Sequence, residues 1–211
     1  EVIGVFVRSP VTKALMEQMP NLKLIVTMST GFDHIDLKEA AARNIAVCNV
    51  PGYGSITVAE FTFALILGLS RKAFLAYRQI KDQHNFDIAH FEGFNLNGKT
   101  LGVAGTGRIG QNVIRIAKGF GMNVLGFDAF PNPQLAEELG FKYVSLDQLL
   151  VNSDIVTLHV PYNKDTHHLI NKDNIKSFKP GALLINTARG EVADTEAVLY
   201  GLEHKILSGA G

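Results

Sequence analysis

Two hydrophobicity patterns alternate along the 211-residue chain. Short runs of consecutive apolar residues, typical of strands buried on both faces, are separated by segments with the three-to-four-residue apolar spacing of a helix. The runs predict strands over residues 2–7, 22–29, 45–50, 99–105, 122–128, 141–144, 154–160, 182–188 and 206–211. The spaced segments predict helices over residues 12–19, 37–44, 56–80, 108–120, 133–140, 146–152, 172–178 and 194–204. This alternation predicts an α/β fold in which helices cover both faces of parallel sheets.

The longest apolar segment, residues 56–69, is shorter than the ~20 residues that cross a bilayer, and it contains Glu60. We therefore expect a buried helix that continues to residue 80. The polar stretch over residues 81–98 breaks the periodicity and marks a domain boundary. Residues 1–75 are expected to form one domain and residues 76–211 another. Thr12 and Asp36 each precede a helical segment and are candidate N-caps.

Composition narrows the function only slightly. The chain has 46% hydrophobic residues, and its 20 Lys and Arg balance its 20 Asp and Glu, whereas nucleic-acid-binding proteins usually have a basic excess. The single cysteine, Cys48, rules out an internal disulfide framework and favours a reducing compartment, so we expect a cytoplasmic protein. Cys48 itself is expected to be a small buried residue at a strand end. The opening "EVIGVFV" lacks the basic start of a signal peptide, and neither nucleic acid nor a membrane is an expected partner.

The strongest motif is "GVAGTGRIG", in which Gly105, Gly107 and Gly110 form a G-x-G-x-x-G pattern. The pattern follows a predicted strand and opens a predicted helix. Asp128 ends the next predicted strand, at the ~20-residue spacing that is typical of a dinucleotide fingerprint. Gly105 would allow the tight turn, Gly107 the approach to a pyrophosphate and Gly110 the close packing of helix on strand. The helix N-terminus would offer N–H groups to the phosphates. A carboxylate at Asp128 would bind the ribose hydroxyls and repel a 2′-phosphate, which favours NAD over NADP.

A second candidate site lies in "LLINTARGEV", where a buried strand delivers Arg189 at its carboxyl end. Ligands in open α/β sheets bind outside such ends, so Arg189 could hold a carboxylate or polarise a carbonyl of a substrate. A structural ion pair with Glu191 or Asp194 is the alternative. In "MSTGFDHID", Thr30 and Gly31 could expose backbone N–H groups to a carboxylate, or could form an ordinary turn.

Three histidines in "LHVPYNKDTHHLI" (His159, His167 and His168) raise the question of a metal site. Their spacing is not that of two ligands on one helical face, and no cysteine or pair of carboxylates accompanies them. We therefore predict no metal. A catalytic histidine among the three is a weaker possibility than surface or loop residues.

Taken together, these motifs resemble the D-2-hydroxyacid dehydrogenase family, especially its D-lactate dehydrogenase-like members. The similarity extends over nearly the whole chain and includes "NVPGYGSITVAEFTFALIL", "GFDAFPN" and "SDIVTLHVPYNKDTHHLI". It implies a Rossmann domain that binds NAD and a flavodoxin-like substrate domain, of which residues 1–75 are part. It also implies an NAD-dependent oxidoreductase that transfers hydride between the nicotinamide and a small 2-oxo acid, with pyruvate and D-lactate as the expected pair.

The resemblance assigns roles residue by residue. Arg189 matches the catalytic arginine, Thr30 and Gly31 match the loop that binds the substrate carboxylate, and Tyr53 matches a substrate-loop aromatic. The remaining matches are positions that bind the cofactor: Gly105, Gly107, Arg108, Ile109, Gly110, Asp128, His159, Val160, Pro161, Thr166, Thr187, Ala188 and Arg189 itself. The resemblance also implies a homodimer, and the apolar helix over residues 56–80 is the expected contact.

The family pattern also includes a further strand and helix before "EVIGVFV", and an aspartate, a glutamate and an acid/base histidine after "SGAG". We therefore expect the sequence to be a fragment, inactive alone, whose Rossmann domain is truncated before its last strand and before the return to the substrate domain. Two alternatives stay open: a catalytically silent NAD-binding sensor or corepressor, and an NADP-linked reductase of glyoxylate or hydroxypyruvate.

Overall fold

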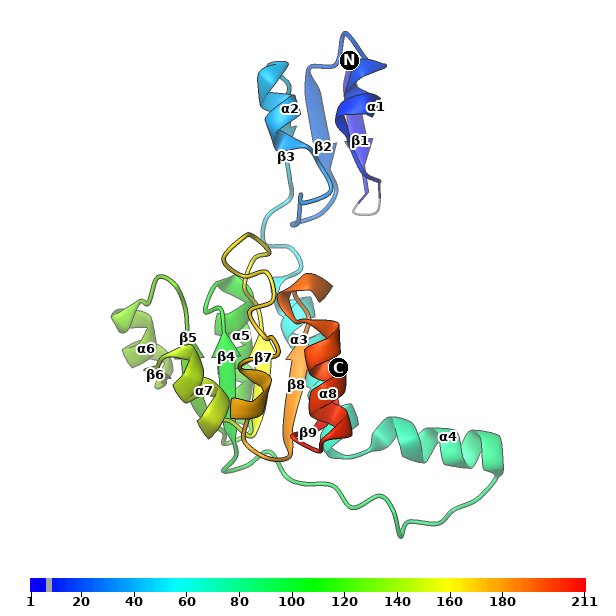
Figure 1. The fold of residues 1–211 in the computed structure, drawn as a ribbon, viewed down its shortest axis with the longest axis vertical. Coiled ribbons are helices and arrows are strands. Elements are labelled where there is room, and N and C mark those ends of the chain that lie inside the picture. The colour runs from blue at the N-terminus through cyan, green and yellow to red at the C-terminus, as the bar shows by residue number, and fades with distance from the viewer. Residues whose placement is uncertain (7–8) are drawn as a thin grey trace. The chain divides into compact units, whose positions relative to one another are not determined.

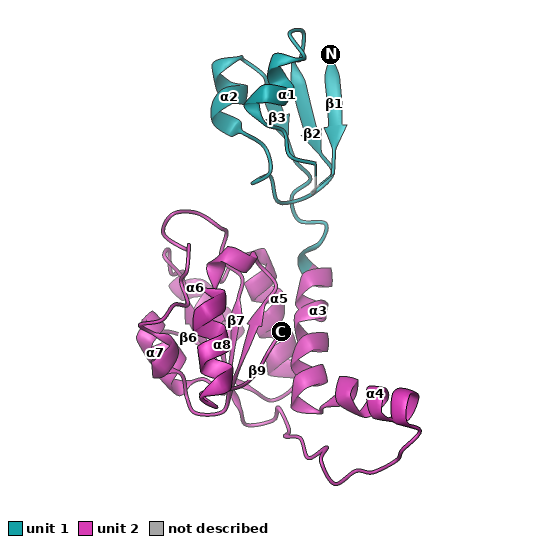
Figure 2. Ribbon diagram, turned by 45° about the vertical axis from the view of Figure 1, so that its right-hand side comes forward, with its two compact units in different colours: residues 1–55 teal, residues 56–211 magenta. Residues whose placement is uncertain are grey.

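The computed structural model describes residues 1–6 and 9–211, and these separate into two compact units, residues 1–55 and residues 56–211 (Figure 2). In both sheets of the described structure, every strand runs parallel to the strands with which it pairs, as the apolar runs predict. The predicted α/β class is therefore confirmed. The strand expected over residues 2–7 extends into residues outside those described.

Unit 1 contains a three-stranded sheet in the order β1-β2-β3. Its elements are β1 (Val2–Val5), α1 (Lys13–Glu17), β2 (Leu24–Thr27), α2 (Leu37–Ala42) and β3 (Ala46–Cys48). Met16 of α1 and Ala40 of α2 pack with Val5 and Ile25 in a small core on one face of the sheet. Both predicted N-caps are confirmed, because the side chains of Thr12 and Asp36 accept hydrogen bonds from the first turns of α1 and α2.

Cys48 is exposed, so the expectation of a buried cysteine is wrong. It lies on the edge strand β3, and the register pairs it with Val26 on β2. Side chains alternate between the two faces of a sheet, which places Cys48 on the face opposite the core of α1 and α2.

Unit 2 contains a six-stranded parallel sheet in the order β6-β5-β4-β7-β8-β9. Its strands are β4 (Thr100–Ala104), β5 (Asn123–Phe127), β6 (Lys142–Tyr143), β7 (Ile155–Leu158), β8 (Ala182–Asn186) and β9 (Leu207–Ala210). Counted within this sheet, the order is 3-2-1-4-5-6, which is that of the doubly wound dinucleotide-binding fold. The segment expected to begin one more strand is β9, which pairs with β8.

Helices cover both faces of this sheet (Figure 1). The helical elements are α3 (Ser55–Ser70), α4 (Ala73–Gln83), α5 (Arg108–Gly119), α6 (Pro133–Leu139), α7 (Leu146–Asn152), α8 (Thr195–Glu203) and the short 3-10 helices η1 (Ile175–Ser177) and η2 (Gly190–Val192). Of these, α4 buries no residue and does not cover the sheet. One core joins α3, α5 and α6 to the sheet, and a second joins α7, η1 and α8 to it. Along β8, Leu183 and Ile185 enter the first core, whereas Ala182 and Leu184 enter the second. The strand is therefore buried on both faces.

The single helix expected over residues 56–80 is two helices, so this expectation is wrong. The backbone turns at Lys72, whose φ of 52° lies in the left-handed region and cannot continue a right-handed helix. Ala59, Phe63 and Ile66 of α3 are buried in the core of unit 2, whereas no residue of α4 is buried. The structural division therefore falls at residue 55 because α3 packs on the second sheet, while the sequence placed the boundary near residue 75.

The segment over residues 172–178, predicted to be a helix, forms only the 3-10 turn η1. The amide of Asn174 donates to the carbonyl of Leu169, and its side-chain oxygen accepts from the backbone N–H of Asn171. Such side chain-to-backbone bonds compete with helical ones. Pro180 lies two residues after the predicted segment and disfavours a longer helix.

Candidate functional site

The motif residues of unit 2 gather at the carboxyl ends of four neighbouring strands. Gly105 follows β4, Asp128 follows β5, His159 follows β7 and Thr187 follows β8. The strand order reverses between β4 and β7, and in open α/β sheets ligands bind in the crevice at this point. The sheet thus brings together segments that are far apart in the sequence.

Two glycines of the motif are required by close packing. Gly105 has a φ of 94°, and a Cβ there would lie 2.7 Å from the backbone of both His159 and Val160. A Cβ on Gly110 would lie 2.0 Å from the carbonyl oxygen of Gly105, so only glycine lets α5 approach the turn. Both observations agree with the roles expected for these glycines in a dinucleotide-binding turn.

Gly107 differs from them, because a Cβ there would meet no described atom within 4 Å. Gly107 is the N-cap of α5, and no described side chain caps this helix end. Arg108 is exposed, and Ile109 packs partly against the core. The first turn of α5 therefore offers backbone N–H groups and the positive end of a helix dipole to an anion. This cradle fits the pyrophosphate of a dinucleotide.

Asp128 is held in one orientation. Its Oδ2 accepts hydrogen bonds from the backbone N–H and the hydroxyl of Thr106 at 2.7 and 2.8 Å, and its Oδ1 accepts one from the N–H of Phe130 at 3.0 Å. Partial burial raises the pKa of Asp128, but the hydrogen bonds from Phe130 and Thr106 outweigh it, so the pKa lies below its ordinary value. Asp128 is therefore a carboxylate at neutral pH.

His159 lies between two threonines. Its Nε2 is 3.0 Å from the hydroxyl of Thr157, and its Nδ1 is 3.4 Å from that of Thr187. The Thr187 hydroxyl is 3.1 Å from that of Thr62 on α3. Burial lowers the pKa of His159 from 6.5 to about 4, so the imidazole is neutral at neutral pH. The network connects the ends of β7 and β8 to α3.

The loop after β7 carries Val160, Pro161 and Thr166. Val160 is buried in the second core. The Thr166 hydroxyl donates to the carbonyl of Pro161 at 2.6 Å and accepts from the N–H of Asn163 at 2.8 Å. These bonds close the loop on itself beside the sheet edge.

Arg189 stands in a turn that is fixed by the side chain of Asn186. The amide nitrogen of Asn186 donates to the carbonyl of Arg189 at 2.8 Å, and its oxygen accepts from the N–H of Ala188 at 3.0 Å. The guanidinium of Arg189 also donates to the carbonyl of Ala188 at 3.0 Å. The nearby Asp194 caps α8 by accepting from the N–H of Glu196. Arg189 is thus half-buried beyond the carboxyl end of β8, in a turn whose backbone is held in place by the side chain of Asn186.

In unit 1, Thr30 and Gly31 lie in the loop after β2. The Thr30 hydroxyl donates to the carbonyl of Val50, and the hydroxyl of the buried Ser29 donates to the carbonyl of Gly31. Among the described residues, none accepts a hydrogen bond from the backbone N–H of Thr30 or Gly31. Tyr53 is 64% exposed. This loop has the free donors that a carboxylate site requires.

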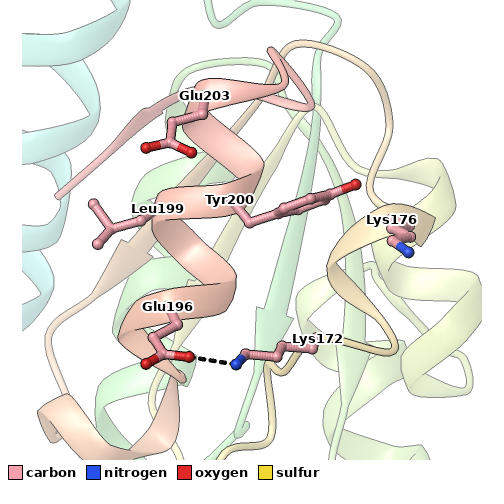
Figure 3. A pocket seen from close by; sticks show the side chains of 6 residues that line it. All are labelled: Lys172, Lys176, Glu196, Leu199, Tyr200 and Glu203. Atoms are coloured by element: carbon pink, nitrogen blue, oxygen red, sulfur yellow. Dashed lines mark hydrogen bonds and ion pairs between the residues drawn. The ribbon is translucent and has the colours of Figure 1, made fainter.

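A surface hollow of about 490 Å³ lies elsewhere, between η1 and α8, and is lined by Lys172, Lys176, Glu196, Leu199, Tyr200 and Glu203 (Figure 3). The Lys172 ammonium pairs with Glu196, and that of Lys176 lies over the Tyr200 ring. None of the motif residues lines it.

Within the described ranges, no three side chains of the metal-binding types His, Cys, Asp and Glu come together. No described helix has the length and apolar content needed to cross a membrane.

The sequence matches the model of a known domain over residues 63–211, that of the D-isomer specific 2-hydroxyacid dehydrogenase, NAD binding domain. The chain belongs to this dehydrogenase family. The family resemblance, the Rossmann fold and NAD as the cofactor are thereby confirmed.

Similar proteins from several organisms agree with this assignment. Glyoxylate reductase of Thermococcus litoralis is 40% identical over 97% of this chain and 64% of its own length. D-lactate dehydrogenase of Escherichia coli is 35% identical over 100% of this chain and 64% of its own length. A structure of D-lactate dehydrogenase from Aquifex aeolicus with NAD and lactic acid superposes with a TM-score of 0.92, at 44% identity, over 100% of this chain and 63% of that one. The chain thus spans slightly under two thirds of the length of these relatives.

Within unit 2 the structure brings the predicted cofactor positions together at one sheet edge, whereas Thr30, Gly31 and Tyr53 belong to unit 1. The roles of the individual residues stay predictions. Three side chains that orient the site are not among the residues predicted from the sequence: Thr106, Tyr143 and Asn186. Thr106 and Asn186 lie inside quoted motifs and could have been suspected, but nothing in the sequence distinguishes Tyr143.

Proposed function

We propose that the protein carrying this chain is an NAD-dependent dehydrogenase that interconverts a small 2-oxo acid and the D-2-hydroxy acid, with pyruvate and D-lactate as the pair. The observation that carries the proposal is the position of Arg189 at the same sheet edge as the dinucleotide cradle. When bound, NADH supplies a hydride to the carbonyl carbon of the substrate. The names of two relatives, D-lactate dehydrogenase and glyoxylate reductase, fall within this reaction class.

Arg189 would bind the substrate and stabilise the charge that develops on its carbonyl oxygen. A guanidinium offers several N–H donors in a planar fork, which suits a carboxylate and an adjacent carbonyl. It stays protonated at neutral pH, so it is not a proton donor. The pKa of His159, at about 4, excludes that residue as the acid at neutral pH. The proton must therefore come from another group.

Thr30 and Gly31 would bind the substrate carboxylate through their backbone N–H groups, and Tyr53 would contact the side chain of the substrate. The free N–H groups of the Thr30–Gly31 loop support this role. A nest of N–H donors binds an anion without a charged side chain. The side-chain end of the substrate would then be contacted by residues such as Tyr53.

Asp128 would select NAD over NADP. Its carboxylate is ionised and held at the end of β5, where a fingerprint acidic residue binds the hydroxyls of the adenosine ribose. A 2′-phosphate at the same place would meet a like charge. This argues against the NADP-linked alternative.

The test of the reaction is NADH oxidation, followed at 340 nm with pyruvate, glyoxylate and hydroxypyruvate, by the protein that the complete reading frame encodes. We expect the highest kcat/KM with pyruvate. Arg189→Ala should lower kcat/KM by roughly 10²-fold or more, as expected for removing a charge-stabilising donor, with NADH affinity nearly unchanged. Arg115→Ala, an exposed arginine on α5, is the matched control. No turnover with any 2-oxo acid alongside tight NADH binding would support the silent sensor instead.

We also propose that this protein is a homodimer. Helix α4 stands away from the sheet of unit 2 (Figures 1 and 2), and Phe74, Leu75, Tyr77 and Ile80 are each more than half exposed on it. Several large apolar side chains exposed together on one helix are typical of an interaction surface. A second copy is the simplest one, because most soluble oligomers are symmetric homo-oligomers.

Sedimentation of the full protein at tens of micromolar tests the dimer. The wild type should sediment as a dimer, and a Leu75→Asp and Ile80→Asp double variant as a monomer. Arg115→Asp changes the charge by two at an exposed ion pair on α5, away from α4, and should leave the dimer intact. A monomeric wild type would refute this part of the proposal.

A cytoplasmic location completes the proposal. It is supported by a sequence whose single cysteine lies exposed, which suits a reducing compartment. Cell fractionation with an antibody against the protein would test it, and recovery outside the cytoplasmic fraction would contradict it.

A further inference from the structure

Two hydrogen bonds in series connect Tyr143 of β6 to the carboxylate of Asp128, and a third reaches that carboxylate from the backbone. The hydroxyls of Tyr143 and Thr106 are 2.8 Å apart, and the Thr106 hydroxyl is 2.8 Å from Oδ2 of Asp128. The backbone N–H of Thr106 reaches the same Oδ2 at 2.7 Å. Thr106 is 5% exposed, so its hydroxyl is shielded from bulk water, whereas Asp128 and Tyr143 are partly buried.

The direction of each bond follows from proton counting. A threonine hydroxyl carries a single hydrogen, and an ionised carboxylate can only accept. The Thr106 hydrogen therefore points to Asp128, and the Thr106 oxygen accepts from the Tyr143 hydroxyl. Tyr143 thus fixes the rotation of the Thr106 hydroxyl. A hydroxyl that accepts a hydrogen bond is also a stronger donor, which strengthens its bond to Asp128.

Packing places the Tyr143 ring. β5 and β6 pair with Gly126 opposite Tyr143. A Cβ on Gly126 would lie 2.6 Å from the Phe141 ring, so glycine leaves room for that ring beside β5. Phe141 in turn meets Tyr143 edge-on, with ring centroids 4.9 Å apart. Asp128 lies two residues after Gly126 and so projects from the same side of the strand.

We propose that Tyr143 is a positioning residue for cofactor choice, which acts through the Thr106 hydroxyl to hold the Asp128 carboxylate toward the ribose diol of NAD. The inference rests on the proposed role of Asp128. With Oδ2 held by Thr106 and Oδ1 by Phe130, the carboxylate cannot rotate away from an incoming 2′-phosphate. Releasing the Thr106 hydroxyl would weaken both the ribose contact and this exclusion.

The experiment measures dissociation constants of NADH and NADPH by nicotinamide fluorescence. Tyr143→Phe keeps the ring and removes the hydroxyl. We expect this variant to weaken NADH binding about threefold to tenfold, the effect of one hydrogen bond. NADPH binding should change less, so the ratio of the NADPH to the NADH dissociation constant narrows toward one. Thr106→Val should narrow the ratio further, and Thr106→Ser, which keeps the hydroxyl, should restore it. Tyr200→Phe on α8 is the matched control.

A second probe separates positioning from general damage. Reduced nicotinamide mononucleotide lacks the adenosine ribose, so its affinity should be the same for the wild type and Tyr143→Phe. An unchanged ratio in Tyr143→Phe, or equal weakening of all three ligands, would overturn the inference. Asp128→Ala is measured in parallel. If it narrows the ratio and Tyr143→Phe does not, only the role of Tyr143 fails. If Asp128→Ala leaves the ratio of the two dissociation constants unchanged, the proposed role of Asp128 fails, and the role of Tyr143 fails with it.

Discussion

The neutral imidazole of His159 makes stability depend on pH in a predictable way. Burial lowers its pKa from 6.5 in an unfolded chain to about 4 in the folded one. Between these values the unfolded chain binds a proton at this ring and the folded chain does not. The free energy of unfolding therefore falls as the pH falls, by ~1.4 kcal/mol per pH unit. The contribution of His159 is fully present above about pH 6.5 and is lost progressively down to about pH 4.

The perturbation that isolates this effect is His159→Gln. Glutamine keeps donor and acceptor atoms for Thr157 and Thr187 but cannot take up a proton. Between pH 7 and pH 5, the wild type should lose about 2 kcal/mol more stability than the variant, from the pKa values of 6.5 and about 4. Titrating carboxylates are common to both proteins and cancel in this difference.

Urea unfolding followed by circular dichroism at pH 7, 6 and 5 gives the stabilities, and an NMR titration of the histidine ring signals gives the pKa directly. His90→Gln, in the exposed segment after α4, should follow the pH dependence of the wild type. A His159 ring that titrates near pH 6.5, or equal pH dependence in the wild type and His159→Gln, would refute the prediction.

Three further substitutions have distinct expected results. Gly110→Ala should destabilise the protein by ~1–3 kcal/mol in urea unfolding, because its Cβ would clash with the carbonyl of Gly105; an unchanged midpoint would contradict the packing role. Gly107→Ala meets open space and should leave the midpoint nearly unchanged, yet weaken NADH binding tenfold or more in a fluorescence titration; unchanged binding would argue against a pyrophosphate at α5. Asn186→Ala frees the turn of Arg189 and should lower kcat about tenfold with NADH affinity retained; an equal loss of NADH affinity would indicate wider damage.

Local patterns were enough to predict the sheet and the dinucleotide turn. Apolar runs with helical segments between them leave few arrangements other than parallel strands, and Gly105 and Gly110 sit where only glycine fits. The break at Lys72 was not predictable, because a lysine in the left-handed region is held there by its surroundings rather than by its own preference. The link between Tyr143 and Thr106 depends on the pairing of β5 with β6, which no local pattern specifies.

The exposed position of Cys48 has a practical consequence. These 211 residues contain no other cysteine, so within them a thiol-reactive dye would attach at one known point, on the edge strand of unit 1. The predicted NADH site lies in unit 2, and the reduced nicotinamide is itself fluorescent. Energy transfer from bound NADH to a dye on Cys48 would therefore report the distance between the two units in solution. Adding a 2-oxo acid would then show whether that distance shortens when substrate arrives, without any engineered label site.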